Sequence, residues 1–68
     1  NSVTDAGVGA LCARTAVIGA YMNVRINAAD YKDKAFITDL ITRGAAIQAK
    51  AIALEAEIIE MVNEKIGT

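Results

Sequence analysis

The fold is decided by the stretch Ala6-Gly7-Val8-Gly9-Ala10-Leu11-Cys12-Ala13-Arg14-Thr15-Ala16-Val17-Ile18-Gly19-Ala20-Tyr21-Met22. On a helix, this stretch is apolar on nearly every side. Only Arg14 and Tyr21, together with Arg25 just beyond the stretch, form a polar side. A helix of that kind is buried among other helices or in a membrane. Ser2 and Asp5 precede it at capping-box spacing, which marks a helix start. We therefore predict a helix over about residues 3–25 that requires neighbours.

The membrane alternative is disfavoured by the composition of this helix. Arg14 lies in its middle and would cost at least about 2.5 kcal/mol at the bilayer centre. The stretch is rich in Ala and Gly rather than Leu and Phe, and no basic residue precedes it. Small residues four apart, such as Ala6 and Ala10, allow helices to approach closely. We expect no membrane span and a place in a helix bundle.

A second, longer helix is predicted over about residues 34–65, after a connector at 26–33 in which Asp30 and Asp33 both suit the N-cap. Its apolar positions follow the three-four spacing of helices that pack along a seam. These positions are Ile37, Leu40, Gly44, Ile47, Ala51, Leu54, Ile58 and Met61. Gly44 within this seam indicates a close helix–helix crossing, because a glycine inside a helix otherwise costs up to about 1 kcal/mol.

Length and composition limit the possible functions. The 68 residues contain one Cys, no His and no Pro, and carry a net charge of −1. An intramolecular disulfide and a Cys/His zinc site are excluded, we expect no metal, and a reducing, cytoplasmic compartment is indicated. The absence of a basic surplus argues against a nucleic-acid partner. So small a core rarely suffices alone, so we expect an all-α antiparallel helical hairpin that completes a bundle with other chains or missing helices. A homodimer forming a four-helix bundle is the smallest such arrangement.

Several residues could carry chemistry. Asp5 is either a helix cap or part of a polar pocket at a helix N-terminus, where amides and dipole favour anionic groups. Arg14 is either an edge residue with its guanidinium in water or a clamp for a carboxylate of a ligand or partner helix. Asn27 suits a C-terminal cap, whereas Asn23 lies on a small-residue face where a buried amide would need partners. Cys12 is interpreted as a small buried hydrophobe, since the chain offers no base to activate it.

Three strings in the chain resemble a known family. They are Asn1-Ser2-Val3-Thr4-Asp5-Ala6-Gly7-Val8-Gly9-Ala10-Leu11, Gly19-Ala20-Tyr21-Met22-Asn23-Val24-Arg25-Ile26-Asn27, and Lys32-Asp33 ahead of the second helix. They resemble the cyclodeaminase/cyclohydrolase family, which comprises the C-terminal domain of formimidoyltransferase-cyclodeaminase and methenyltetrahydrofolate cyclohydrolases of the serine-cycle type. The resemblance implies a dimerising all-helical domain and a tetrahydrofolate derivative as substrate. The implied reaction is ring closure of formimidoyltetrahydrofolate with loss of ammonia, or hydrolysis of methenyltetrahydrofolate to the formyl form.

The same resemblance implies roles for individual residues. It places Asn1, Ser2, Asn23 and Asn27 near the folate, with Asp5 as the proton-handling group, and Arg14 is added as a candidate clamp for the substrate's carboxylate. The Gly-rich Pro-Gly-Gly-Gly-Ser-type segment of the family's N-terminal part has no counterpart here, which leads us to expect the C-terminal portion of a longer domain. The competing interpretation is a non-catalytic helical oligomerisation module, which the heptad seam of the second helix alone would justify.

Overall fold

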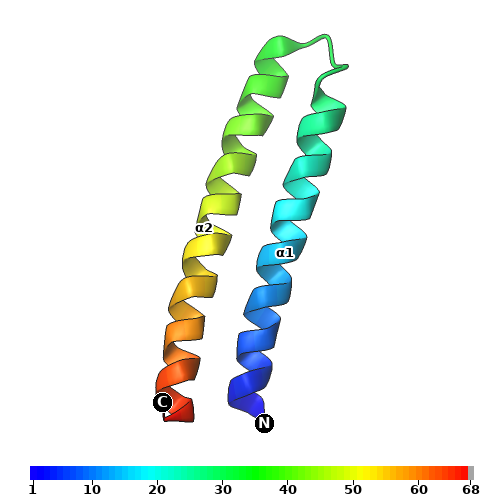
Figure 1. The fold of residues 1–68 in the computed structure, drawn as a ribbon. Helices are drawn as coiled ribbons and strands as arrows, with labels where there is room; N and C mark the ends of the chain where they lie inside the picture. Colours follow the sequence, from blue (N-terminus) through cyan, green and yellow to red (C-terminus); the bar gives the residue numbers. More distant parts are fainter. Residues whose placement is uncertain (68) are drawn as a thin grey trace.

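The computed structural model describes residues 1–67 as a hairpin of two helices, α1 (Ser2–Ala28) and α2 (Lys34–Ile66). The helices lie side by side and antiparallel, with both termini at the end opposite the connector (Figure 1). The molecule is a rod of 52 × 15 × 14 Å. The prediction of an all-α antiparallel hairpin is confirmed. Helix α1 runs three residues beyond the predicted end at 25, so the connector shrinks to residues 29–33.

The start of α1 differs from the predicted cap. Asn1 is the N-cap, and its Oδ1 accepts from the amides of Val3 at 2.8 Å and Thr4 at 3.4 Å. The Asn1 amino group donates in return to the Thr4 Oγ1 at 3.5 Å, which completes a capping box one residue earlier than predicted, and the Thr4 hydroxyl also donates to the Asn1 carbonyl at 3.0 Å. Asn is at least as good a cap as Ser, and it takes up helix amides that would otherwise lack partners. The interpretation of Ser2 and Asp5 as the box was therefore wrong, and the Asp5 carboxylate is not needed as a cap.

The connector resolves the choice between two caps. Asp33 is the N-cap of α2, with its Oδ1 accepting from the Phe36 amide at 3.1 Å. The expectation that Asn27 caps the end of α1 was wrong, because Asn27 lies inside the helix and Ala29 is the C-cap. The Asn27 Nδ2 instead donates to the Asn23 carbonyl one turn back, at 2.9 Å. At the far end of α2, Gly67 takes the left-handed conformation, with φ 85°, that a C-cap favours.

The face of α1 that packs on α2 contains residues that were predicted to be its polar side. Its at least partly buried residues follow three-four spacing, and they are Val3, Gly7, Ala10, Arg14, Val17, Tyr21, Val24 and Ala28, with Ile18 beside them. Arg14 and Tyr21 thus lie in the helix–helix seam, whereas Arg25 is exposed. Long side chains with a polar tip can pack their stems in such a seam and keep the tip hydrogen-bonded or wet. The periodicity could not reveal this, since other faces of α1 are equally apolar.

The seam of α2 also differs from the predicted one in its second half. The at least partly buried residues are Ile37, Leu40, Ile41, Gly44, Gln48, Ala51, Glu55, Ile58, Ile59 and Val62. Three residues of the predicted seam instead remain exposed: Ile47 at 60%, Leu54 at 45% and Met61 at 55%. Helix α2 is therefore rotated so that Gln48 and Glu55 face α1. A row of apolar side chains is left without a partner among residues 1–67.

Size complementarity explains where the two helices approach most closely. The Tyr21 ring lies against Gly44, where an added Cβ would sit 2.5 Å from the ring. The Tyr21 hydroxyl donates to the Ile41 carbonyl at 2.9 Å, and the Arg25 guanidinium lies 4.7 Å from the ring centroid. Toward the other end, Gly7 faces Val62. The predicted close crossing at Gly44 is confirmed, and the large residue that requires it is Tyr21.

Helix α1 is long and apolar enough to cross a membrane, by length and composition alone. Only 11% of its most apolar window is buried within the hairpin. The core helix of a soluble bundle passes the same test. Arg14 near its middle is paired to α2, which is the arrangement expected of a helix that packs among other helices.

Candidate functional site

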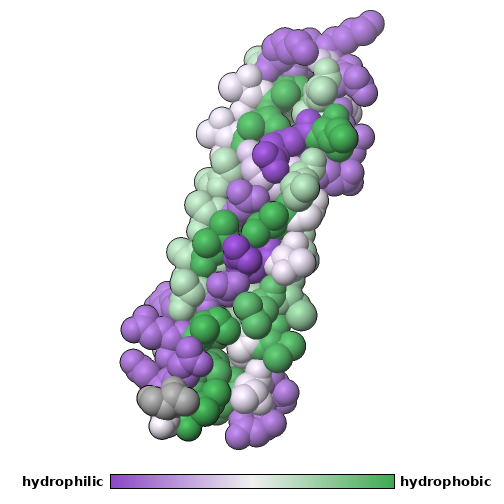
Figure 2. All heavy atoms as spheres, viewed as in Figure 1, coloured by the Kyte–Doolittle hydropathy of each residue, from purple (hydrophilic) through white to green (hydrophobic). Residues whose placement is uncertain are grey.

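Three hollows lie between the helices along the rod, and the two nearer the connector form a shallow groove. Figure 2 shows hydrophobic side chains over much of the length of the face it presents, interrupted by hydrophilic ones. Neighbouring hollows at the connector end share Val24 and Leu40, so they are continuous. The third hollow lies at the open end of the hairpin, where Ser2 lines it, and it shares no lining residue with the other two.

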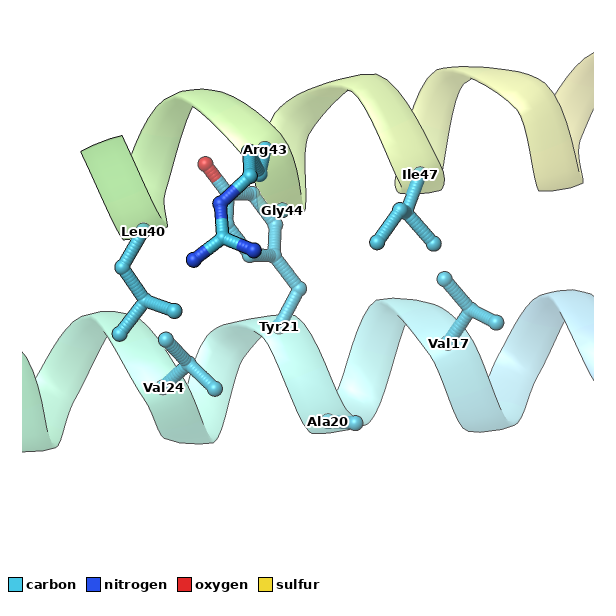
Figure 3. A pocket seen from close by; sticks show the side chains of 8 residues that line it. All are labelled: Val17, Ala20, Tyr21, Val24, Leu40, Arg43, Gly44 and Ile47. Atoms are coloured by element: carbon cyan, nitrogen blue, oxygen red, sulfur yellow. The ribbon is translucent and has the colours of Figure 1, made fainter. Parts of the chain in front are cut away.

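The middle of the groove is apolar and has a volume of about 280 Å³. Figure 3 shows Val24 opposite Leu40 and Val17 opposite Ile47, with the Tyr21 ring reaching across to Gly44 between them. Arg43 lies at its rim and is held by Asp39 through an Nε–Oδ2 contact of 3.0 Å. With apolar walls and a single charged side chain, this part of the groove suits an apolar surface rather than a polar reaction centre.

The hollow at the connector end combines amide groups with aromatic rings. It is lined by Asn23 and Asn27 of α1, by Tyr31 of the connector and by Phe36 of α2, among others. The rings of Tyr31 and Phe36 lie 5.9 Å apart and are tilted by 36°. The Asn27 Nδ2 donates to the main-chain carbonyl of Asn23 and to its side-chain Oδ1. The Asn23 Nδ2 and the Asn27 Oδ1 therefore remain as one donor and one acceptor for a ligand.

The hollow at the open end is lined by Ser2 and Ala6 of α1 and by Met61 and Lys65 of α2, among others. Asn1 and Asp5 lie at the same end, and both are exposed. The Asn1 Oδ1 is occupied as the helix cap. The Asp5 carboxylate makes no hydrogen bond or ion pair within residues 1–67, so it is available to a ligand or to another chain. Lys65 gives this end a cation that sequence reasoning did not single out.

The predicted site residues therefore fall into separate groups. At about 1.5 Å per residue, Asp5 and Asn23 lie about 27 Å apart along α1. The structure brings Asn1, Ser2 and Asp5 together at one end of the rod, and Asn23 and Asn27 at the other. No short ligand can touch both groups within one hairpin. This separation is the main geometric constraint on any function assigned to them.

Arg14 lies between the two groups, and its Nε is 3.3 Å from the Glu55 Oε2 across the seam. The side chains are 40% and 17% exposed, respectively. The contact has ion-pair distance without hydrogen-bond geometry. The Gln48 Oε1, two turns from Glu55 on α2, also has no hydrogen-bond partner among residues 1–67. Two roles were considered for Arg14, and one of them was to bind a carboxylate. The carboxylate beside it is that of Glu55 in the same chain. The role of Arg14 in substrate binding stays a prediction.

The Arg14–Glu55 pair is expected to contribute modestly to stability. A double-mutant cycle with Arg14→Met and Glu55→Gln should give a coupling energy of about 0.2–1 kcal/mol, because water reaches the guanidinium. Urea unfolding at fixed chain concentration measures it. The Asp39–Arg43 pair, with both side chains 64% exposed, is the control and should give about 0.5 kcal/mol or less. A coupling energy above about 2 kcal/mol would show that the pair is more shielded from water than the exposed fractions of its side chains indicate.

Other candidate chemistry is sparse. No group of three or more His, Cys, Asp or Glu that could hold a metal ion is found in the described part of the chain. Cys12 was expected to be buried and is exposed, because the small-residue face of α1 points away from α2. The aromatic pair of Tyr31 and Phe36 was also missed. The sequence signal for this pair was an aromatic residue on each side of Asp33, because the turn at the Asp33 N-cap brings the two rings close together.

Comparison with known proteins agrees with the family resemblance of the sequence. The family model described as formiminotransferase-cyclodeaminase matches residues 1–46. A methenyltetrahydrofolate cyclohydrolase from Methylorubrum extorquens is 35% identical over 67 residues, which is 98% of this chain. The chain spans 32% of that relative's length. No solved structure shows significant similarity.

Proposed function

The chain belongs to the formiminotransferase-cyclodeaminase family, and from this membership we propose that it forms part of an enzyme acting on a one-carbon unit carried by tetrahydrofolate. The finer proposal is hydrolysis of methenyltetrahydrofolate, the substrate in the name of the Methylorubrum relative. Ring closure of formimidoyltetrahydrofolate with loss of ammonia is the other reaction the family name supports. The exposed, unpaired Cys12 fits a reducing, cytoplasmic location, which is part of the same proposal.

The observation that carries the proposal is the hollow at the connector end. A pterin ring is flat, and its edge carries both hydrogen-bond donors and acceptors. The Asn23 Nδ2 and the Asn27 Oδ1 supply the complementary donor and acceptor. Tyr31 and Phe36 supply aromatic surface on which such a ring can stack. We assign the pterin to this hollow and the two asparagines to its recognition.

Asp5 is assigned to proton handling. In the hydrolysis, the oxygen of water bonds to the methenyl carbon, one of the two carbon–nitrogen bonds to that carbon breaks, and the formyl group remains on the other nitrogen. The water loses both of its protons as its oxygen becomes the formyl oxygen: one reaches the departing nitrogen, and the other is released to solvent because the methenyl substrate is a cation. A carboxylate can accept a proton from the attacking water and pass it to the departing nitrogen. Asp5 suits this role because it is acidic, exposed and not used as a cap, and Asn1 and Ser2 lie beside it to bind the substrate. Since about 27 Å along α1 separates this end from Asn23, the Asp5 that acts on a pterin held by the asparagines belongs to a second chain.

A second candidate function is a non-catalytic helical oligomerisation module. It is favoured by the exposed apolar row of Ile47, Leu54 and Met61, which is suited to burial against another helix. The two candidates predict different ligands. A module of this kind has no reason to bind a folate, whereas the enzyme must.

Turnover of methenyltetrahydrofolate and of formimidoyltetrahydrofolate tests the proposal. The protein should be purified in the form in which the cell makes it, and the loss of methenyl absorbance or the release of ammonia recorded. Hydrolysis above the spontaneous rate is expected, together with a rise in melting temperature on addition of formyltetrahydrofolate. If neither folate is turned over and none shifts the melting temperature, the enzyme assignment fails and the oligomerisation module remains.

A further inference from the structure

The proposed function occupies only one of the two continuous hollows between the helices. The pterin is assigned to the hollow at the connector end, whereas the middle hollow has no assigned occupant. Both hollows are lined by Val24 and Leu40, so a ligand in the first can extend into the second. In a tetrahydrofolate derivative, the pterin continues into a p-aminobenzoyl ring and then into a glutamate with two carboxylates. The middle hollow is therefore open to this second part of the substrate.

The middle hollow has the walls that an aromatic ring requires. It is lined on α1 by Val17 and Val24, and on α2 by Leu40 and Ile47. The Tyr21 ring reaches across between them (Figure 3). Aromatic rings bind well against apolar and aromatic side chains, whereas a carboxylate loses its hydration there without gaining a partner. The hollow, of about 280 Å³, therefore suits the p-aminobenzoyl ring and does not suit the glutamate that follows it.

One charged side chain, that of Arg43, lies at the rim of this hollow. Its Nε is held by the Asp39 Oδ2 at 3.0 Å, which fixes the guanidinium group. The two terminal nitrogens make no hydrogen bond or ion pair within residues 1–67, and Figure 3 shows them directed toward α1. The planar guanidinium can hold both oxygens of one carboxylate. Arg43 therefore offers a free carboxylate-binding group over the middle hollow.

The spacing along α2 agrees with the order of groups in the substrate. Arg43 lies two turns from Phe36, about 10 Å along the helix. The carboxylates of the substrate are likewise separated from its pterin by the length of the p-aminobenzoyl ring. We propose that the middle hollow receives this ring and that Arg43 binds a glutamate carboxylate of the same substrate molecule. This inference rests on the proposed function, and it makes Arg43 a determinant of specificity for the glutamate-bearing substrate.

Other cationic side chains are engaged or lie elsewhere. Among residues 1–67, Arg43 is the one Lys or Arg that lines either of the two continuous hollows. Arg14 is ion-paired across the seam, and Arg25 lies over the Tyr21 ring, 4.7 Å from its centroid. Lys65 lines the hollow at the open end, which shares no lining residue with the groove. Arg43 is therefore the cation that a substrate extending along the groove would meet.

Kinetics with a matched pair of substrates test the role of Arg43 in the protein as the cell makes it. One substrate is methenyltetrahydrofolate, and the other is its diamide, in which uncharged amides replace both glutamate carboxylates. In the wild type, the diamide should have a KM about three- to tenfold higher with kcat retained. Hydrogen bonds between charged groups are strong, but water competes at a side chain that is 64% exposed. Arg43→Met should raise KM for methenyltetrahydrofolate by the same factor and leave KM for the diamide unchanged.

Two further variants isolate the charge and the shape of the group. Arg43→Lys should recover only part of the affinity, because an ammonium lacks the planar fork. Lys50→Met is the matched control and should change neither KM, since Lys50 is an exposed cation on α2 that lines none of the three hollows. An equal KM for the two substrates in the wild type would overturn the assignment of Arg43, as would an equal effect of Arg43→Met on both. A wild type that neither turns over nor binds methenyltetrahydrofolate would refute the proposed function itself, and the inference with it.

Filling the hollow tests the position of the ring without any turnover. Ala20 lines the middle hollow, so the side chain of Ala20→Phe should occupy it. Calorimetric titration should then show about tenfold weaker binding of both formyltetrahydrofolate and its diamide, because the ring that they share loses its apolar site. Ala16→Phe, one turn away on α1 and outside the three hollows, is the control and should bind both ligands normally. Normal binding by an Ala20→Phe protein with the melting temperature of the wild type would place the ring elsewhere and overturn the proposal.

Discussion

Replacing Asp5 by Asn is expected to lower the turnover of methenyltetrahydrofolate by about 10²–10⁴-fold, the range that a positioned general acid or base contributes. The exchange keeps size and shape and removes only the ability to accept and return a proton. Because Asn1 and Thr4 form the capping box, the helix start should survive. The loss of an acid near the helix N-terminus should cost no more than about 1 kcal/mol of stability. Steady-state kinetics, separating kcat from KM, measure the effect.

Glu60→Gln is a matched control for this experiment, since Glu60 is an exposed acid on α2 that lines none of the three hollows. It should leave both kinetic constants unchanged. A role of Asp5 in the chemistry predicts a fall in kcat, whereas a role in binding alone predicts a rise in KM with kcat retained. Unchanged turnover in Asp5→Asn would remove Asp5 from the catalytic assignment.

The hairpin could be predicted from the sequence because its signals are local. The long apolar periodicities, the Asp33 cap and the absence of Pro each determine backbone structure within a few residues. Gly44 could also be interpreted correctly, since a glycine in a helix seam indicates close packing. The relative rotation of the two helices could not be predicted in the same way. It depends on which apolar face of each helix meets the other, and α1 offers several faces of similar hydropathy.

The relative rotation of the two helices determines which side chains lie in the seam and which remain exposed at the candidate site. Arg14 and Tyr21 are polar by composition, yet both lie in the seam because Glu55 and Gly44 face them. Ile47, Leu54 and Met61 fit a seam by spacing, yet α1 does not cover them. The sequence resemblance named Asp5 and Asn23 together, and one helix holds them far apart. Only the three-dimensional structure shows that a site containing both residues would need a second chain.

Replacing Gly44 by Ala is expected to lower the free energy of unfolding by about 1–3 kcal/mol, the usual cost of overpacking. On helix propensity alone the same change would stabilise by up to about 1 kcal/mol. The sign is reversed because the new Cβ would lie 2.5 Å and 2.6 Å from the Cε1 and Cδ1 atoms of Tyr21. That ring cannot turn aside without losing its hydrogen bond to Ile41 and its contact with Arg25. Urea unfolding followed by circular dichroism, at fixed chain concentration, measures the change.

Two further variants isolate the cause. Gly7→Ala is the matched control, because a Cβ there would meet the Val62 methyl groups at 3.5 Å, an ordinary contact, so propensity should prevail and stability should rise. In a Tyr21→Leu background the ring is absent and the flexible leucine can turn away, so Gly44→Ala should become neutral or stabilising. If it remains as costly there as in the wild type, Tyr21 is not what requires Gly44. A cost that disappears with the ring instead shows that one aromatic side chain on α1 sets how closely α2 approaches, and through that the shape of the groove both helices line.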